Sequence, residues 1–259
     1  MKLAAIGDNC MDVYSTGEAF PGGNPVNVAV YYARLGGEAS YTGVVGTDAY
    51  GTRMKSAIAS KGVDVSHVLS AEGKTAVTHV ELVNGDRVFG DYDEGVLADF
   101  RPTPQQLDFV CGHDLVITAL WGNVHDELAK IHARGVKIAY DAATRPDSIP
   151  AQTAVRSADY FFFSAKEDTK ELREKMKTLH AQGPKIVVAT LGSAGSIAYD
   201  GAGYTTFGII PCEAVDTLGA GDSYIAGFLK GIAEEQPLKE CMKMGASNAS
   251  VTLGYFGAW

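Results

Sequence analysis

Short apolar runs that alternate with helix-forming segments constrain the fold of this chain more than any other feature. The first run covers residues 3–6 and is closed by Gly7. Such runs, bounded by turns, are typical of strands buried on both faces. Their alternation with helices predicts an α/β fold with a mostly parallel sheet. The expected strands cover residues 3–6, 39–45, 115–119, 136–140, 160–163 and 186–189. The expected helices cover residues 26–35, 50–61, 126–134, 166–182, 222–232 and 238–253.

One segment departs from this rhythm. Residues 76–83 alternate between apolar and polar side chains, Asn84 and Gly85 form a strong hairpin-turn signal, and residues 87–92 return. Alternation predicts a sheet with one solvent-facing side. We therefore expect a single domain over residues 1–259 with a small β-lid from about 9–24 and 74–97. An exposed hairpin edge needs cover, which predicts a homodimer through the lid.

Composition limits the classes of function. The 259 residues are 46% hydrophobic and 20% charged, enough apolar material for a buried core. A formal net charge of −9 gives no support to nucleic acid or an anionic membrane as the main partner. No stretch approaches the roughly 20 apolar residues of a membrane span, and the four cysteines form no C-x-x-C pair. These observations predict a cytoplasmic protein with reduced thiols.

The run VDTLGAGD at residues 215–222 places three small residues between two carboxylates, directly before a helix-favouring segment. A small-residue turn at a helix start points backbone N–H groups at one place and suits an anion. Gly219, Ala220 and Gly221 are the expected donors. A carboxylate there would repel a phosphate, but Asp222 suits a general base that deprotonates an attacking hydroxyl. The alternative is that Asp222 caps the helix.

Polar residues near the first strand form a second candidate site, for a polyol. Asp8 and Asp12 follow the strand of residues 3–6, at the edge where open α/β sheets bind ligands. Gly23 belongs to a glycine pair that opens a helix, and Asn24 and Asn27 can exchange hydrogen bonds with hydroxyls. A carboxylate accepts strongly from two neighbouring hydroxyls. An ordinary turn with a helix cap is the alternative.

Two weaker signals concern a nucleotide and its metal. The run TLGSAG places Thr190, Gly192 and Gly195 after a strand, where backbone could approach a nucleotide, although a tight β-turn has the same composition. Glu167 follows the strand of residues 160–163 and could organise Mg²⁺ through water. The alternative is a first-turn glutamate that the helix dipole favours. The chain has no P-loop motif.

Together these motifs resemble the ribokinase-like (PfkB) carbohydrate kinase family over essentially the whole chain. The run DTLGAGD at residues 216–222 matches the family's C-terminal signature D-T-x-G-A-G-D, and the glycines at 22–23 with Asn27 match its N-terminal signature. The resemblance implies a ribokinase-like three-layer α/β/α fold with a mostly parallel central sheet and a small β-lid. It also implies transfer of the γ-phosphoryl group of ATP to a sugar hydroxyl.

The resemblance also implies roles for individual residues. Asp222 would be the base, and the N–H groups of residues 219–221 would hold developing charge. Asp12 and Asn27 would contact the sugar, Asn248 would lie beside adenine, and the TLGSAG run would lie near the nucleotide. ATP and Mg²⁺ are the implied cofactors. Many members also bind a monovalent cation such as K⁺, which would here involve Asp216.

Two family patterns are incomplete. The usual N-x-x-E after the fifth core strand reads SAKE at residues 164–167, which keeps Glu167 but replaces the asparagine with Ser164. The usual D-P-N-x-R reads DAATR at residues 141–145 and keeps only Asp141 and Arg145. The resemblance implies that Arg145 would reach the transferring phosphate. These departures keep a non-catalytic sugar-binding regulator as an alternative from another class.

Several stretches resemble the family members that phosphorylate fructoselysine, an aminosugar, on its 6-hydroxyl. These stretches are residues 7–10, 23–31, 87–92 and 257–259. Phe89 and Tyr92, beside the acids at 91, 93 and 94, suit a cationic aminosugar better than a plain ketose. The alternatives are a solvated acidic hairpin, or a kinase of the ribokinase, fructokinase or ketodeoxygluconate kinase type.

Overall fold

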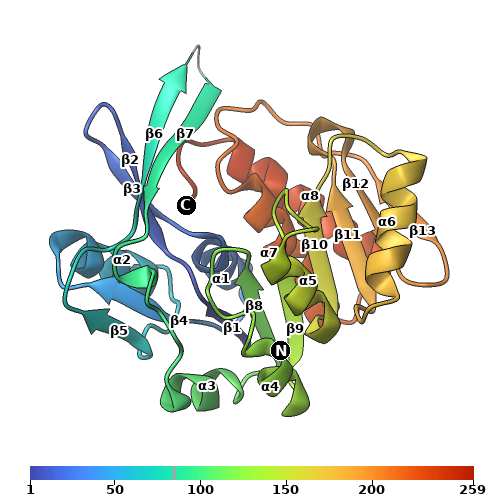
Figure 1. Cartoon of the computed structure of the whole chain (residues 1–259). Coiled ribbons are helices and arrows are strands. Elements are labelled where there is room, and N and C mark those ends of the chain that lie inside the picture. The colour runs from blue at the N-terminus through green and yellow to red at the C-terminus, as the bar shows by residue number, and fades with distance from the viewer. Residues whose placement is uncertain (84–85) are drawn as a thin grey trace.

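The structure, a computed structural model, describes residues 1–83 and 86–259 and contains two sheets (Figure 1). The larger sheet has nine strands in the order β13-β12-β11-β10-β9-β8-β1-β4-β5. All of its neighbouring strands run parallel except at β12, which is antiparallel to both neighbours. The strands are β1 (Leu3–Ile6), β4 (Ala39–Gly46), β5 (Val68–Ala71), β8 (Leu115–Ala119), β9 (Lys137–Asp141), β10 (Tyr160–Ser164), β11 (Ile186–Thr190), β12 (Ser196–Tyr199) and β13 (Tyr204–Phe207).

Helices cover both faces of this sheet, so each inner strand is buried on both sides. In β1, Leu3 and Ala5 enter one core while Ala4 and Ile6 enter the other. This period of two explains the continuous apolar runs in the sequence. The helices of the first core are α1 (Asn24–Arg34), α2 (Ala49–Ser60), α7 (Ala220–Ala233) and α8 (Leu238–Leu253). Those of the second are α3 (Pro104–Val110), α4 (Leu128–Ala133), α5 (Ile149–Ala154) and α6 (Lys170–His180).

The expected three-layer α/β/α fold is therefore confirmed, with some local corrections. The helix expected from residue 166 begins at Lys170, because Thr169 caps it by accepting from the Leu172 N–H at 3.1 Å. The helix expected over residues 126–134 covers Leu128–Ala133. The short helices α3 and α5 were not expected. None of the helices in the described part of the chain has the length and apolar character that a membrane span requires.

The smaller sheet has four strands in the order β3-β2-β6-β7 and stands at the upper left of Figure 1. Its strands are β2 (Cys10–Tyr14), β3 (Ala19–Gly22), β6 (Val77–Val83) and β7 (Asp86–Asp93). Asp12 was expected at the end of the first strand but lies inside β2. The turn expected at Asn84 and Gly85 lies outside the described residues.

Packing between α1 and α7 brings the two sequence signatures together. Helix α1 begins at Asn24, directly after the glycine pair, and α7 begins at Ala220. The ring of Phe228 in α7 meets Phe162 in β10 edge to face, with centroids 5.4 Å apart. Such a pair stabilises by about 0.5–1.5 kcal/mol beyond the area it buries. Helix α7 is thus fixed on the sheet with its first turn beside the first turn of α1.

Candidate active site

The turn before α7 has a backbone that requires glycine. Gly219 precedes the helix with φ of 73°, in the left-handed region. A Cβ at this position would overlap the hydroxyl of Tyr31. The first intrahelical bond runs from the Ser223 N–H to the Gly219 carbonyl at 2.8 Å. Of the three expected anion donors, Ala220 already donates to the Thr217 carbonyl at 3.3 Å, while Gly221 is exposed.

Asp222 is the third residue of α7 and does not cap it. Its carboxylate is buried, and no side-chain cap bond forms at this helix start. It accepts instead from two amides of α1, Asn27 Nδ2 at 2.8 Å and Asn24 Nδ2 at 3.0 Å. The capping alternative for Asp222 therefore does not describe the structure.

Asn24 joins three buried carboxylates. Besides Asp222, its Nδ2 donates to Asp141 Oδ2 at 3.1 Å, and its backbone N–H donates to Asp8 Oδ2 at 3.2 Å. The other oxygen of Asp8 is buried without a hydrogen-bond partner. Asp8, Asp141 and Asp222 come from the ends of β1 and β9 and from α7, and we call them the acid cluster. No lysine, arginine or histidine side chain among the described residues forms an ion pair with it.

Burial dominates the protonation of the acid cluster. It raises the pKa of Asp8 to about 7 and that of Asp141 to about 6. It also raises the pKa of Asp222 well above its usual range, and repulsion from Asp141 adds to this while the bond from Asn27 opposes it. A carboxylate whose pKa lies near the working pH is suited to exchange protons.

The predicted polyol side lies next to the acid cluster. Gly23 has φ of 109°, and a Cβ there would lie 2.6 Å from the Cα of Asn9, so the backbone segments touch. Asp12 is buried in β2 and pairs in register with Thr78 of β6, which pairs with Tyr92 of β7. Asp12 and Tyr92 therefore belong to one row across the small sheet. Tyr92 is partly exposed, and burial together with Asp8 raises the pKa of its hydroxyl.

Two residues expected on the substrate side are not placed in this group of contacts. Arg145 is exposed on the segment after β9. The side chain of Phe89 lies outside the described residues. Ala143, between Asp141 and Arg145, has φ of 48° and donates its N–H to Asp141 at 2.9 Å. Its backbone thus occupies a conformation that asparagine, the usual residue of the family pattern, adopts more easily.

The TLGSAG run forms a tight turn at the end of β11. Thr190 Oγ1 lies 2.9 Å from the hydroxyl of Ser164 at the end of β10. Gly192 and Gly195 both have positive φ, and a Cβ at Gly195 would overlap the Phe207 carbonyl. Ser164 therefore bonds across the sheet at the position where the family has asparagine.

The remaining predicted residues occupy different environments. Glu167 is exposed after β10. Asn248 is buried, and both ends of its amide serve other residues: Nδ2 donates to the Ser223 carbonyl at 2.8 Å, and Oδ1 accepts from Arg34 at 2.9 Å. Asp216 is buried and accepts from the N–H groups of Leu218 at 3.0 Å and Gly257 at 2.7 Å.

Comparison with known proteins identifies the class of this site. The sequence pattern of the pfkB family carbohydrate kinases matches residues 5–259. The chain belongs to this family. It is an ATP-dependent sugar kinase, and the expectation drawn from its motifs is confirmed.

Relatives of this kinase agree with the family assignment. It is 45% identical over 258 residues to fructoselysine 6-kinases of Shigella flexneri and Escherichia coli, covering 99% of each chain. It is 34% identical to a fructosamine kinase of Bacillus subtilis, covering 100% of this chain and 93% of the relative. The solved ribokinase of Arabidopsis thaliana has a TM-score of 0.89 at 22% identity, over 99% of this chain and 93% of that one. That likeness shows the ribokinase-like fold.

The kinase also contains contacts at its site that sequence patterns did not predict. The indole N–H of Trp259 donates to Asn27 Oδ1 at 2.7 Å. The hydroxyl of Tyr31 donates to the carbonyl of Ala258. Trp121, partly exposed just beyond β8, lies at the same edge of the sheet as the acid cluster. No local spacing signals a contact between residues 232 positions apart, although the resemblance of residues 257–259 to related kinases pointed at this segment.

Proposed function

We propose that this kinase transfers the γ-phosphoryl group of ATP to the 6-hydroxyl of fructoselysine, with Asp222 as the general base. The observation that carries the proposal is the buried Asp222 carboxylate, held by Asn24 and Asn27 at the start of α7. The identity to fructoselysine 6-kinases supports the acceptor.

In the proposed reaction, Asp222 takes the proton of the 6-hydroxyl as its oxygen attacks the γ-phosphorus. The bond from the γ-phosphorus to the β–γ bridging oxygen breaks, and ADP leaves with that oxygen. Negative charge on the transferring group would lie at the positive end of α7, near the N–H groups of Gly219 and Gly221. Asn24 and Asn27 keep the carboxylate oriented toward the hydroxyl.

The described residues fit a magnesium ion held mainly by phosphates and water. They contain no group of three or more acidic, histidine or cysteine side chains that could hold a metal by themselves, and Glu167 is a single exposed carboxylate. Mg²⁺ commonly keeps several waters and takes few protein ligands. Bound with ATP, it would neutralise phosphate charge, and Glu167 would orient its waters.

A potassium site would involve Asp216. Its buried carboxylate joins the loop before α7 to the segment around Gly257, so a cation there would stabilise the two loops that adjoin Gly219.

Charge supports a cationic acceptor. The acid cluster and Asp12 place four buried carboxylates around the sugar side. A protonated aminosugar gains from the charge of those carboxylates that are ionised and favours their ionisation, whereas a sugar acid would be repelled by them. The partly exposed Tyr92 offers an aromatic face near the same side.

ATP turnover with fructoselysine, psicoselysine, fructose and ribose tests the proposal, with ³¹P NMR to locate the phosphate. We expect the highest kcat/KM and a 6-phosphate with fructoselysine. Asp12→Ala is expected mainly to raise KM for the sugar. A higher kcat/KM for fructose or ribose would rule out the proposed acceptor, and undiminished turnover by Asp222→Asn would rule out the proposed base.

We also propose a homodimer through the small sheet, because β7 is its edge strand. Light scattering at micromolar concentration would measure twice the mass of one chain. A monomeric mass would contradict this assembly.

A further inference from the structure

Trp259 lies two hydrogen bonds away from Asp222. Its indole N–H donates to Asn27 Oδ1 at 2.7 Å, and Asn27 Nδ2 donates to Asp222 Oδ2 at 2.8 Å. Asn27 is buried, and Trp259 is partly buried against the core that contains α1. The three side chains thus form a directional chain that ends on the carboxylate.

The chemistry of the two ends fixes the amide between them. An indole N–H can only donate, and an ionised carboxylate can only accept. If the amide of Asn27 were rotated by 180°, its oxygen would face the carboxylate and its N–H₂ group would face the indole N–H. Both contacts would then be repulsive. Trp259 therefore selects the one orientation in which Asn27 donates to Asp222.

Several contacts hold Trp259 in place. The carbonyl of Ala258 accepts from the hydroxyls of Tyr31 and Tyr255, the latter at 3.1 Å. The Gly257 N–H is bound to Asp216. The Lys61 ammonium, 5.8 Å from the centre of a Trp259 ring, takes no part in these hydrogen bonds. The indole thus lies on a segment anchored to α1 and to the loop before α7.

We infer that Trp259 is a positioning residue for the phosphoryl-transfer reaction, acting on Asp222 through Asn27. The inference rests on the proposed function of Asp222 as the base. Hydrogen bonds in series polarise one another, so the indole strengthens the donation from Asn27. That donation favours the ionised carboxylate, the form a base requires.

The pH dependence of activity should report this link. Asp8, Asp141 and the Tyr31 hydroxyl are the other titratable groups that interact with Asp222, and Trp259→Phe changes none of them. Without the indole donor, Asn27 stabilises ionised Asp222 less. The acid limb of kcat/KM should then move to higher pH, which loss of packing alone would not cause.

The test compares Trp259→Phe with Lys61→Met, which removes the cation over the ring but keeps the indole donor. We expect kcat of Trp259→Phe to fall by about tenfold, as for loss of a hydrogen bond that acts on a charged group, with an unchanged KM for ATP. We expect Lys61→Met to keep the wild-type kcat and pH profile. In an Asn27→Ala background, Trp259→Phe should cause no further loss. An equal loss in both backgrounds would overturn the inference.

A measurement on the wild-type fold separates this inference from the proposed function. The chain has two tryptophans, so Trp121→Phe assigns their indole N–H signals in a ¹H–¹⁵N spectrum. The Trp259 signal should shift with pH as Asp222 titrates, and this shift should disappear in Asp222→Asn. A pH-independent signal would refute the link even if Asp222 proves to be the base. Undiminished turnover by Asp222→Asn, together with a pH-dependent Trp259 signal in the wild type, would refute the base and leave the hydrogen-bonded link in place.

Discussion

Buried acids have different partners at the two ends of the parallel strands of the central sheet. We call the side where these strands begin the amino edge and the side where they finish the carboxyl edge. At the amino edge, Asp159 precedes β10 and is satisfied by Lys185 Nζ at 2.9 Å and by the Ile138 N–H at 2.9 Å. At the carboxyl edge, Asp8, Asp141 and Asp222 are held by amides, without a cation among the described residues. A buried carboxylate without a cation costs stability. We therefore expect the acids at the carboxyl edge to serve function and Asp159 at the amino edge to serve stability.

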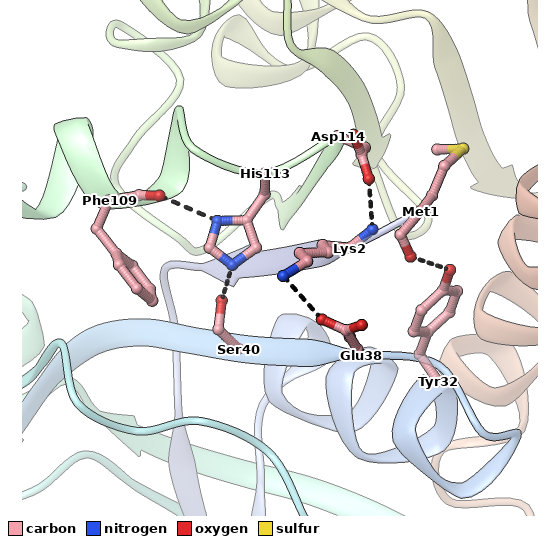
Figure 2. Close-up of polar contacts among 8 residues, drawn as sticks. All are labelled: Met1, Lys2, Tyr32, Glu38, Ser40, Phe109, His113 and Asp114. Carbon is pink, nitrogen blue, oxygen red and sulfur yellow. Dashed lines mark hydrogen bonds and ion pairs between the residues drawn. The ribbon is translucent and has the colours of Figure 1, made fainter.

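The amino edge also has polar contacts nearer the surface (Figure 2). The Lys2 ammonium meets Glu38 at 3.0 Å, and the Lys2 N–H donates to Asp114 at 2.6 Å. His113 donates through Nδ1 to the Phe109 carbonyl at 3.0 Å, and its Nε2 lies 3.0 Å from the Ser40 hydroxyl. A cavity of about 430 Å³ lies among these residues, at the edge opposite the acid cluster. Its polar groups already have partners within the protein.

The largest difference should appear between Asp222→Asn and Asp159→Asn, which each neutralise one buried carboxylate. Loss of the proposed base should lower kcat by about 10²–10⁴-fold, while Tm at pH 8 stays at or above that of the wild type because a destabilised charge is removed. Asp159→Asn should lower the free energy of unfolding by about 1 kcal/mol through its lost ion pair, and kcat should change by less than about twofold. Kinetics and thermal unfolding measure both effects. A greater loss of kcat in Asp159→Asn than in Asp222→Asn would contradict the proposed difference between the two edges.

Asp141→Asn should make stability less dependent on pH. The pKa of Asp141 is raised from 3.8 to about 6 in the folded state, so the wild type loses stability as pH rises through this window. The variant lacks this loss. Its free energy of unfolding should equal that of the wild type near pH 4 and exceed it by up to about 3 kcal/mol above pH 7.

Urea unfolding at both pH values measures this difference. The acid limb of kcat/KM should also move to lower pH in Asp141→Asn, because Asp141 raises the pKa of Asp222. A constant stability difference across the pH range would contradict the prediction.

Alanine substitutions at two glycines, one at each edge, distinguish the cost of backbone strain from the cost of a steric overlap. Gly219 and Gly135, which precedes β9 at the amino edge, have φ of 73° and 85°. Alanine at either position should cost about 1 kcal/mol in backbone strain. Only Gly219→Ala also overlaps Tyr31, since a Cβ at Gly135 meets no atom within 4 Å. We expect Gly219→Ala to lose a further 1–3 kcal/mol, about the cost of overpacking, and to lower kcat. Equal Tm values would contradict this.

The smallest effect is expected for Lys2→Met. Its ion pair with Glu38 is exposed, with 62% and 73% of the two side chains accessible. Such pairs contribute about 0–1 kcal/mol, so Tm should change little and kcat should stay at the wild-type value. Differential scanning calorimetry at two salt concentrations measures this. A large, salt-independent fall in Tm would show that the amino edge depends on this pair.

Features encoded over a few residues were predicted well from the sequence. The strands appear as apolar runs, and the turn before α7 appears in seven consecutive residues. Helix α3 was missed although Thr103 and Gln106 form a capping box with Pro104 at the first turn, a signal that can be read locally. Asp12 was misplaced because the strand pattern of β2 depends on its pairing with β3 and β6.

The polar contacts that orient Asp222 could not be predicted from spacing. Asn24 joins acids that lie 16, 117 and 198 residues away in the sequence. These residues come together only when β1, β9, α1 and α7 are packed. A periodic pattern in the sequence therefore cannot predict their contacts. The motifs indicated which residues we expect to meet the substrate, and the packing determines their protonation.

The contact of Trp259 with Asn27 has a consequence for truncation of the chain. A chain that stops after residue 253 still contains every acid of the cluster, both asparagines and all strands of the central sheet. It lacks the indole and the Gly257 N–H that binds Asp216. We therefore expect a chain truncated after residue 253 to keep most of its fold and to lose turnover. It should differ from the 259-residue chain more in kcat than in Tm.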